Sequence, residues 1–273
     1  MNLTNHSGII TLCLCFMLTF AACHQPTRET TPHAAKQFLK LRGYNFDEKS
    51  FIEAAKRNDL AAVNAFFTAG INPDAKDEDT GGTALVAAAS RGDLDMVKAL
   101  LKGGTDVNGK DDKGFTALLR ALQNKHDAVA DLLVGQPNLE PNAQGSTGVT
   151  ALMTYVWHER EDVVKNLLDR GADVNLRDAD GDAALHGAAQ IGNISILQLL
   201  LAKGADPNVK NKLGGTPLMW AGVYGHDQVA RILLEKGADP GIKDADGMTA
   251  SAWATKNNRT ELAKFLQDAE TKK

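Results

Sequence analysis

The most informative absences in this 273-residue sequence concern cysteine, aromatic residues and clustered positive charge. All three cysteines lie within the first 23 residues, so the rest of the chain has no internal disulfide, thiolate zinc site or cysteine nucleophile. Aromatic residues make up only 5% of the chain, while alanine, leucine and glycine are abundant, which favours helices and tight turns. The 30 Lys and Arg form no block and face 34 Asp and Glu, which argues against a general nucleic-acid binder.

Motifs of common catalytic and cofactor sites are missing as well. No segment reads GxxxxGK[ST] or GxGxxG, so the glycine loops that cradle phosphates are absent. His158-Glu159 comes nearest to the zinc motif HExxH, but no second histidine follows at the required spacing. Residues 178–182 partly resemble a calcium loop, but their glycine comes too early and Ala189 stands where the loop needs glutamate. We therefore expect no catalytic residue, no metal and no cofactor.

An apolar run at residues 9–22 indicates export. Its 14 residues carry no charge, are fewer than the roughly 20 that span a membrane, and suit the centre of a signal peptide. The run ends in FAAC, which resembles the lipobox of bacterial lipoproteins. The resemblance implies a signal peptide at 1–22, a lipid on Cys23 and a flexible tether at 23–33. Since His24 follows, it also implies the periplasm and the outer membrane. An ordinary cleaved signal peptide and an uncleaved anchor are the alternatives.

The remainder of the chain is built from one repeated unit. A phrase Gly-x-Thr-Ala/Pro-Leu recurs every 33 or 34 residues, and a second phrase, Gly-Ala-Asp-x-Asn, occupies residues 171–175 and 204–208. This period and these phrases resemble the ankyrin repeat. The resemblance implies an all-α solenoid of about seven helix–turn–helix units with projecting β-turn or hairpin fingers at residues 46–270. A capping helix at 34–45 would precede it and a frayed tail at 271–273 would follow. The third positions of the first phrase are Thr83, Thr116, Thr150, Ala183, Thr216 and Thr249.

The local chemistry of the sixth unit agrees with that architecture. Thr216 is suited to cap a helix, and Pro217 to occupy its first position. Gly225 ends this helix, and a second one begins at about Asp227. Gly237 is placed to stop the second helix in a left-handed conformation. Because one unit cannot bury its apolar face alone, neighbouring units must stack.

Several side chains are predicted to be interior. In the capping helix we expect Phe38 and Leu41 to form the buried face. Trp220 and Trp253, which are 33 residues apart, are expected in the core. His186 occupies a position where the resemblance implies hydrogen bonds to neighbouring turns. In the fourth unit Tyr155-Val156 replaces a pair of small residues, which should bend or loosen the stack locally or position Trp157.

The resemblance places the ends of the first helices on a concave face and the turn tips beside it. Aromatic residues in a polar surrounding favour a protein interface. The alternatives are scattered surface hydrophobes and residues packed against neighbouring turns. The candidate binding residues are Phe115, Trp157, His158, Ile191, Lys212, Leu213, Tyr224 and Met248.

We interpret the chain as a non-catalytic module on the bacterial envelope that binds a protein partner. The prediction includes no nucleic acid, a monomeric state, and membrane contact only through the lipid anchor. One alternative is a periplasmic immunity or inhibitor protein that blocks a toxic enzyme. Others are a secreted effector and an enzyme whose site is assembled across repeats.

Overall fold

The computed structural model describes residues 31–271 of the chain. The predicted signal peptide, Cys23 and most of the predicted tether therefore lie outside the described residues. Within the described part, none of the helices is both long and apolar enough to cross a bilayer.

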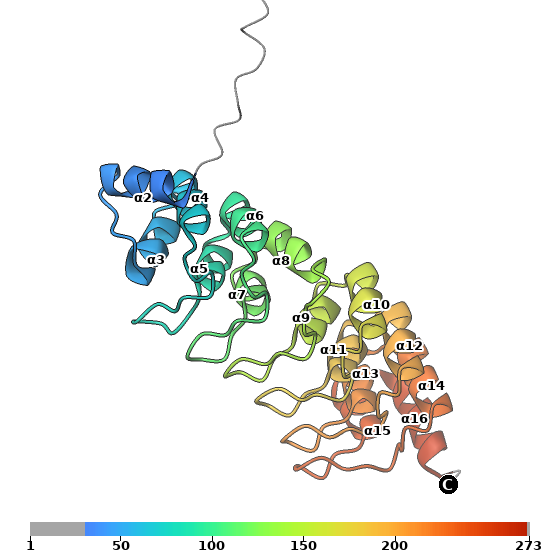
Figure 1. The fold of residues 1–273 in the computed structure, drawn as a ribbon. Helices are drawn as coiled ribbons and strands as arrows, with labels where there is room; N and C mark the ends of the chain where they lie inside the picture. Colours follow the sequence, from blue (N-terminus) through green and yellow to red (C-terminus); the bar gives the residue numbers. More distant parts are fainter. Residues whose placement is uncertain (1–30, 272–273) are drawn as a thin grey trace, which may run out of the picture.

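The described residues form fifteen helices and no regular strand. Helix α2 (Pro32–Leu41) comes first, and seven helix pairs follow, which confirms the predicted all-α ankyrin-type solenoid. Figure 1 shows the pairs stacked in two rows, with the connections between repeats projecting as fingers beside the first row. The first helices are α3 (Glu48–Lys56), α5 (Ala84–Arg91), α7 (Ala117–Gln123), α9 (Ala151–Trp157), α11 (Ala184–Ile191), α13 (Pro217–Tyr224) and α15 (Ala250–Lys256). The second helices are α4 (Leu60–Ala69), α6 (Leu94–Lys102), α8 (Asp127–Val134), α10 (Glu161–Asp169), α12 (Ile194–Ala202), α14 (Asp227–Glu235) and α16 (Thr260–Thr271).

Threonine caps start most of the first helices, as predicted for α13. The Thr216 hydroxyl accepts a hydrogen bond from the backbone N–H of Met219, and Pro217 occupies the first turn. The same cap occurs at α5, α7, α9 and α15. Gly225 ends α13 at φ +79°, and Gly237, just past the end of α14, has φ +89°. These left-handed positions favour glycine, because other residues are strained there.

The fingers are joined to one another by main-chain hydrogen bonds. A backbone N–H near the tip of each later finger donates to a carbonyl of the finger before it, at 2.8–3.1 Å. The bonded fingers therefore hold a fixed position relative to their neighbours. The pairs are Asp112 to Thr80, Ser146 to Lys113, Ala179 to Thr147, Lys212 to Asp180 and Ala245 to Leu213.

Asparagines form a second set of links, in the turns that lead into the fingers. The side chain of Asn175 donates to the Gly204 carbonyl at 3.1 Å and accepts from the Asp206 N–H at 3.1 Å. Asn208 repeats this arrangement with the next repeat. One side chain thus satisfies two main-chain groups of the following unit, which sets the spacing between repeats.

The buried face of α2 differs from the prediction. Leu41 is 85% exposed and Phe38 is also exposed, whereas Ala35 and Leu39 are buried, and α2 packs on α4. The prediction was wrong because the stripe of α2 that packs on α4 runs through Ala35 and Leu39, which are four residues apart, and not through Phe38 and Leu41. At the other end of the chain, α16 continues through Thr271.

The two tryptophans predicted in the core are only half-buried. Both pack against the core from its edge. The indole Nε1 of Trp253 donates to the Asp244 carboxylate at 2.7 Å, and the Lys256 ammonium lies 4.5 Å from the ring centre. Their interior position is therefore confirmed only in part.

The stack loosens between the third and fourth repeats. Among neighbouring first helices, α7 and α9 are the least closely packed, and Figure 1 shows a wide step between them. Tyr155 fills a position that holds alanine in the other repeats, such as Ala188 and Ala221, and its side chain is buried. The loose packing therefore occurs at the repeat where the sequence predicted that bulky residues bend or loosen the stack.

Candidate protein-binding surface

Most of the candidate binding residues are accessible. Leu213, on a fingertip, is 72% exposed; Trp157, at the end of α9, is 51% exposed; and Tyr224, at the end of α13, is 42% exposed. His158 and Lys212 are also exposed. These large side chains stand on caps and fingertips that the fold holds in place, so they need little ordering on binding.

Phe115 does not belong to this exposed set. Its ring is buried in the third finger, under the Arg120 guanidinium at 4.1 Å from the ring centre. Gly145 of the next finger approaches so closely that an added Cβ would lie 2.5 Å from the ring. Phe115 therefore packs against a neighbouring turn, which the sequence analysis gave as an alternative to a binding role. Ile191 and Met248 are half-buried.

The ring of Tyr224 is held by its neighbours. The Gln190 side chain donates to the Tyr224 hydroxyl at 2.9 Å, and the His226 ring stacks on Tyr224 at 6.2 Å between ring centres. His226 is fixed in turn, because its Nε2 lies 3.0 Å from the Gln190 carbonyl oxygen. This anchors an aromatic side chain on the surface without burying it.

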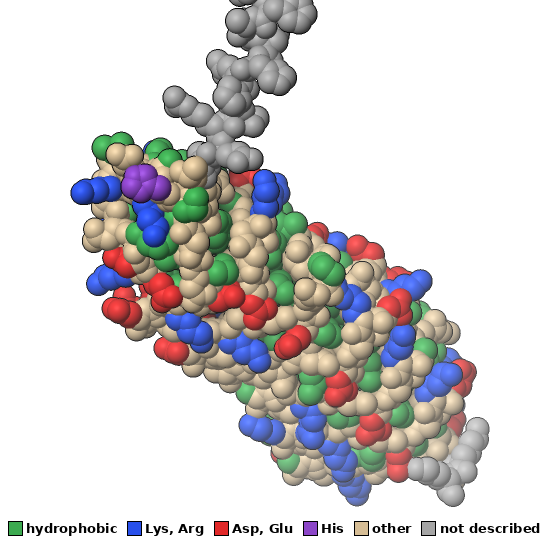
Figure 2. All heavy atoms as spheres, in the orientation of Figure 1, with side chains coloured by type: hydrophobic (Ala, Val, Ile, Leu, Met, Phe, Trp, Pro, Cys, Tyr) green, Lys and Arg blue, Asp and Glu red, His purple; other side chains and the backbone are tan. Residues whose placement is uncertain are grey.

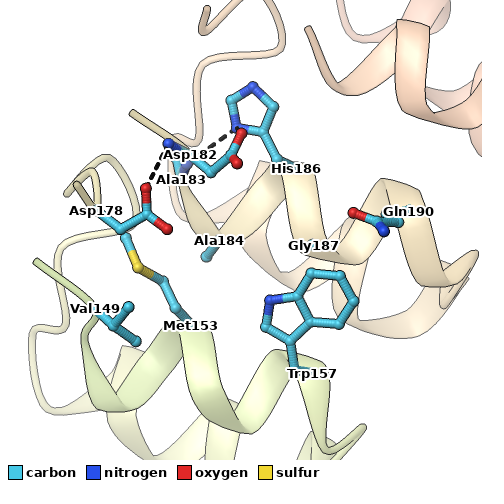
Figure 3. A pocket seen from close by; sticks show the side chains of 10 residues that line it. All are labelled: Val149, Met153, Trp157, Asp178, Asp182, Ala183, Ala184, His186, Gly187 and Gln190. Carbon is cyan, nitrogen blue, oxygen red and sulfur yellow. Dashed lines mark hydrogen bonds and ion pairs between the residues drawn. The ribbon is translucent and has the colours of Figure 1, made fainter. Parts of the chain in front are cut away.

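A cavity of about 150 Å³ opens beside Trp157, between α9 and α11. Figure 3 shows the Trp157 indole lying along Gly187, with Met153 and Asp178 on the other side of the opening. A Cβ at position 187 would lie 3.3 Å from Trp157 Nε1, so the ring rests against bare backbone. Sequence reasoning treated Asp178 only as part of a weak calcium resemblance and did not identify this cavity.

The aspartates of residues 178–182 are used to build a turn. Asp178 Oδ1 accepts the backbone N–H groups of Asp180 and Asp182, both at 2.9 Å. Among residues 31–271 no group of three His, Cys, Asp or Glu side chains could hold a metal ion.

His186 forms part of the cavity wall and has a structural role. Ala183 replaces the capping threonine of α11, and its backbone N–H donates to His186 Nδ1 at 3.0 Å. The opposite ring nitrogen, Nε2, then carries the proton and donates to the Gly215 carbonyl in the next finger at 3.2 Å. This confirms the predicted bond to a neighbouring turn. Burial lowers the pKa of His186, and the nearby Asp182 carboxylate, 3.7 Å away, opposes that shift only in part.

The face of the molecule drawn in Figure 2 is polar and mixed in charge. Figure 2 shows Lys, Arg, Asp and Glu side chains interspersed with small apolar areas along the face in view. Stacked helix pairs, linked fingers and isolated exposed aromatics define the class of protein: a repeat solenoid with a fixed surface along one side.

The comparison with protein families identifies that solenoid. A model described as "Ankyrin repeats (3 copies)" matches residues 51–145 and 185–273, and one described as "Ankyrin repeats (many copies)" matches residues 149–201. The chain belongs to the ankyrin-repeat family, whose repeats are protein–protein interaction modules.

Two similar proteins illustrate the match. The crystal structure of an ankyrin repeat domain from Acinetobacter baumannii AYE is 28% identical with a TM-score of 0.59, covering 68% of this chain and 96% of that one. The mouse protein described as "Protein fem-1 homolog A-like" is 39% identical over 67 residues, which are 24% of this chain. That match spans only 10% of the mouse protein's length.

Proposed function

We propose that this chain is a non-catalytic module of the bacterial envelope that binds one protein through its first-helix ends and fingertips. The observation that carries the proposal is the exposure of Trp157, Leu213 and Tyr224 on a framework whose fingers are bonded together. Exposed aromatic anchors with polar surroundings are typical of protein interfaces. Since the framework is preformed, association orders few groups.

Site-specific crosslinking tests the binding surface. Leu213 would be replaced by a photoreactive phenylalanine analogue in the full chain, and Lys165, exposed on the outer helix α10, would carry the same group as a control. We expect a covalent adduct with one protein from position 213 and none from position 165. Trp157→Ala with Tyr224→Ala should abolish the adduct while the thermal unfolding temperature stays within the range of the unmodified chain. Equal adducts from both positions, or none from position 213, would contradict the proposal.

We further propose that the module is attached to the periplasmic side of the outer membrane by a lipid on Cys23. The support is the motif that ends at Cys23 and the absence of cysteine from the repeats. Metabolic labelling with a fatty-acid analogue is expected to label the unmodified chain but not Cys23→Ser. The matched control is Cys15→Ser, which removes a cysteine within the apolar run and should leave both the label and outer-membrane fractionation intact. Label retained by Cys23→Ser would contradict the anchor.

A further inference from the structure

Four fingers contain an aspartate whose carboxylate organises the turn. In each case Oδ1 accepts backbone N–H groups from residues further along the same finger, at 2.9–3.2 Å. The second oxygen, Oδ2, accepts none of these backbone N–H groups. The four residues are Asp77, Asp111, Asp178 and Asp244.

In three of these fingers, a side chain on a first helix donates to Oδ2. In two of them the donor lies nine residues after the aspartate: Arg120 Nε at 2.8 Å and Trp253 Nε1 at 2.7 Å. In the remaining finger the donor is the Lys56 ammonium, at the end of the preceding first helix, which pairs with the aspartate's Oδ2. Two of the three donors are cations. The pairs are Lys56–Asp77, Arg120–Asp111 and Trp253–Asp244.

Asp178 has neither kind of donor. The residue nine positions later is Gly187, and the position equivalent to Lys56 on the preceding helix holds Trp157. No group within residues 31–271 donates to Asp178 Oδ2. The nearby cation Arg177 is engaged elsewhere, because its guanidinium donates to the carbonyls of Gly181 and Lys210. The cavity lies where the missing donor would be, with Asp178, Trp157 and Gly187 all in its lining.

The shape and chemistry of this cavity fit a guanidinium group. Its volume of about 150 Å³ is the size of a cavity that accepts benzene. A guanidinium group is planar, stacks on an indole ring and donates to a carboxylate. Arg120 does this within the chain, because it binds Asp111 Oδ2 and lies over the Phe115 ring.

We propose that this cavity receives an arginine side chain of the protein partner, which stacks on Trp157 and donates to Asp178. The arginine would supply from outside the interaction that Arg120 supplies to Asp111 from within. The inference rests on the proposed binding function and specifies the chemistry of one anchor residue of the partner.

Nuclear magnetic resonance on the full chain in detergent tests the inference with a defined probe. N-acetyl-arginine methylamide would be titrated while the indole N–H signals are recorded, with the Trp157 signal assigned through Trp157→Phe. The neutral isostere N-acetyl-citrulline methylamide is the matched ligand. We expect a saturable shift of the Trp157 signal that is at least about tenfold weaker with citrulline, because a hydrogen bond between charged groups contributes at least that factor. The Trp253 signal, whose indole is already bonded, should not move.

Asp178→Asn is the decisive variant. It keeps an oxygen that can build the finger, since Asn211 Oδ1 accepts two backbone N–H groups in the next finger, at 2.8 and 3.1 Å. We expect arginine binding to weaken about tenfold or more. Asp180→Asn removes the same charge two residues away, where the side chain is exposed and outside the cavity lining, and should leave binding unchanged. Gly187→Arg should block the probe by filling the cavity from within.

The outcomes separate this inference from the proposed function. An arginine probe that gives no saturable shift, or binds Asp178→Asn as tightly as the unmodified chain, overturns the arginine site. The proposed function still stands in that case if the Leu213 adduct forms. Loss of the adduct in Asp178→Asn but not in Asp180→Asn would place the partner's own arginine in the cavity.

Discussion

His186 stands three residues after Ala183, the residue that replaces the capping threonine of α11, and brings a titratable ring to the start of that helix. At α13 the Thr216 hydroxyl accepts the N–H of Met219, three residues into the helix. At α11 the His186 imidazole accepts the backbone N–H of the capping residue Ala183 and donates to the Gly215 carbonyl. This arrangement requires the neutral ring, because a protonated Nδ1 cannot accept a hydrogen bond. The cap of this repeat is therefore sensitive to pH, unlike a threonine cap.

We expect stability to fall as the pH drops below about 6.5. Burial lowers the pKa of His186 in the folded chain, whereas the unfolded chain binds the proton near the ordinary value of 6.5. Between these two pKa values the unfolded state holds more protons, so the free energy of unfolding rises with pH and the stabilisation is lost on acidification. Urea unfolding at pH 7.5 and pH 5.5 measures the difference. Ala183→Thr with His186→Met, which copies the Thr150 and Met153 pair of α9, should reduce the pH effect. If the unmodified chain and this double variant lose the same free energy of unfolding between pH 7.5 and pH 5.5, His186 is not the source of the pH effect.

At the scale of helix packing, the loose step between α7 and α9 coincides with a buried tyrosine on α9. The Tyr155 side chain, which comes from α9, is buried, and its hydroxyl donates to Asp131 on α8 at 3.4 Å. Burial raises the pKa of this phenol, which stays protonated and able to donate. Arg160 also contacts the Asp131 carboxylate, at 3.2 Å. The Tyr155 side chain therefore also occupies space at the loose step, where its ring is buried and its hydroxyl is bonded.

Removing that side chain should weaken the third and fourth repeats. We expect Tyr155→Ala to lower the free energy of unfolding by about 3–5 kcal/mol, because the cavity left by a large ring closes only partly. Tyr155→Phe keeps the ring and should cost only about 1 kcal/mol, the value of one hydrogen bond. Urea unfolding followed by circular dichroism measures both. Similar losses for the two variants would show that the hydroxyl, not the volume, holds the step.

The asparagine links make another prediction at the level of repeat spacing. Asn175→Ala removes one donor and one acceptor that serve the following repeat, so we expect a loss of about 1 kcal/mol. Asn166→Ala, on the exposed face of α10, is the matched control and should change stability by a few tenths of a kcal/mol at most. The comparison uses the denaturant midpoint of each variant. A control that is as destabilised as Asn175→Ala would assign the loss to a general effect.

Local signals made the helices predictable, whereas several contacts could not be predicted. Thr216 and Pro217 mark a helix start by their own chemistry, and the period near 33 residues repeats such signals. The buried face of α2 was missed because it is set by how the helix packs on α4, a contact between segments that the residues of α2 alone do not specify. Phe115 was misplaced because Arg120 and the next finger cover it. The cavity was missed because it results from an absent side chain, at Gly187.

Across the whole molecule, each repeat contacts only its neighbours, so damage should stay local. Leu39 is buried between α2 and the first repeat, and we expect Leu39→Ala to increase hydrogen exchange in α2, α3 and α4 but not in α13–α16. Leu41→Ala, at an exposed position of the same helix, should leave exchange unchanged. Increased exchange along the full length after Leu39→Ala would show that the solenoid unfolds as one unit.

The bare backbone at Gly187 also determines how easily the cavity can be lost in evolution. In the genetic code every glycine codon becomes an arginine codon by one base change. A single point mutation would therefore let the chain fill its own cavity and satisfy Asp178, in the way that Arg120 already satisfies Asp111. We expect related chains that use this cavity to retain glycine at position 187. Related chains with arginine at that position are expected to bind a different partner.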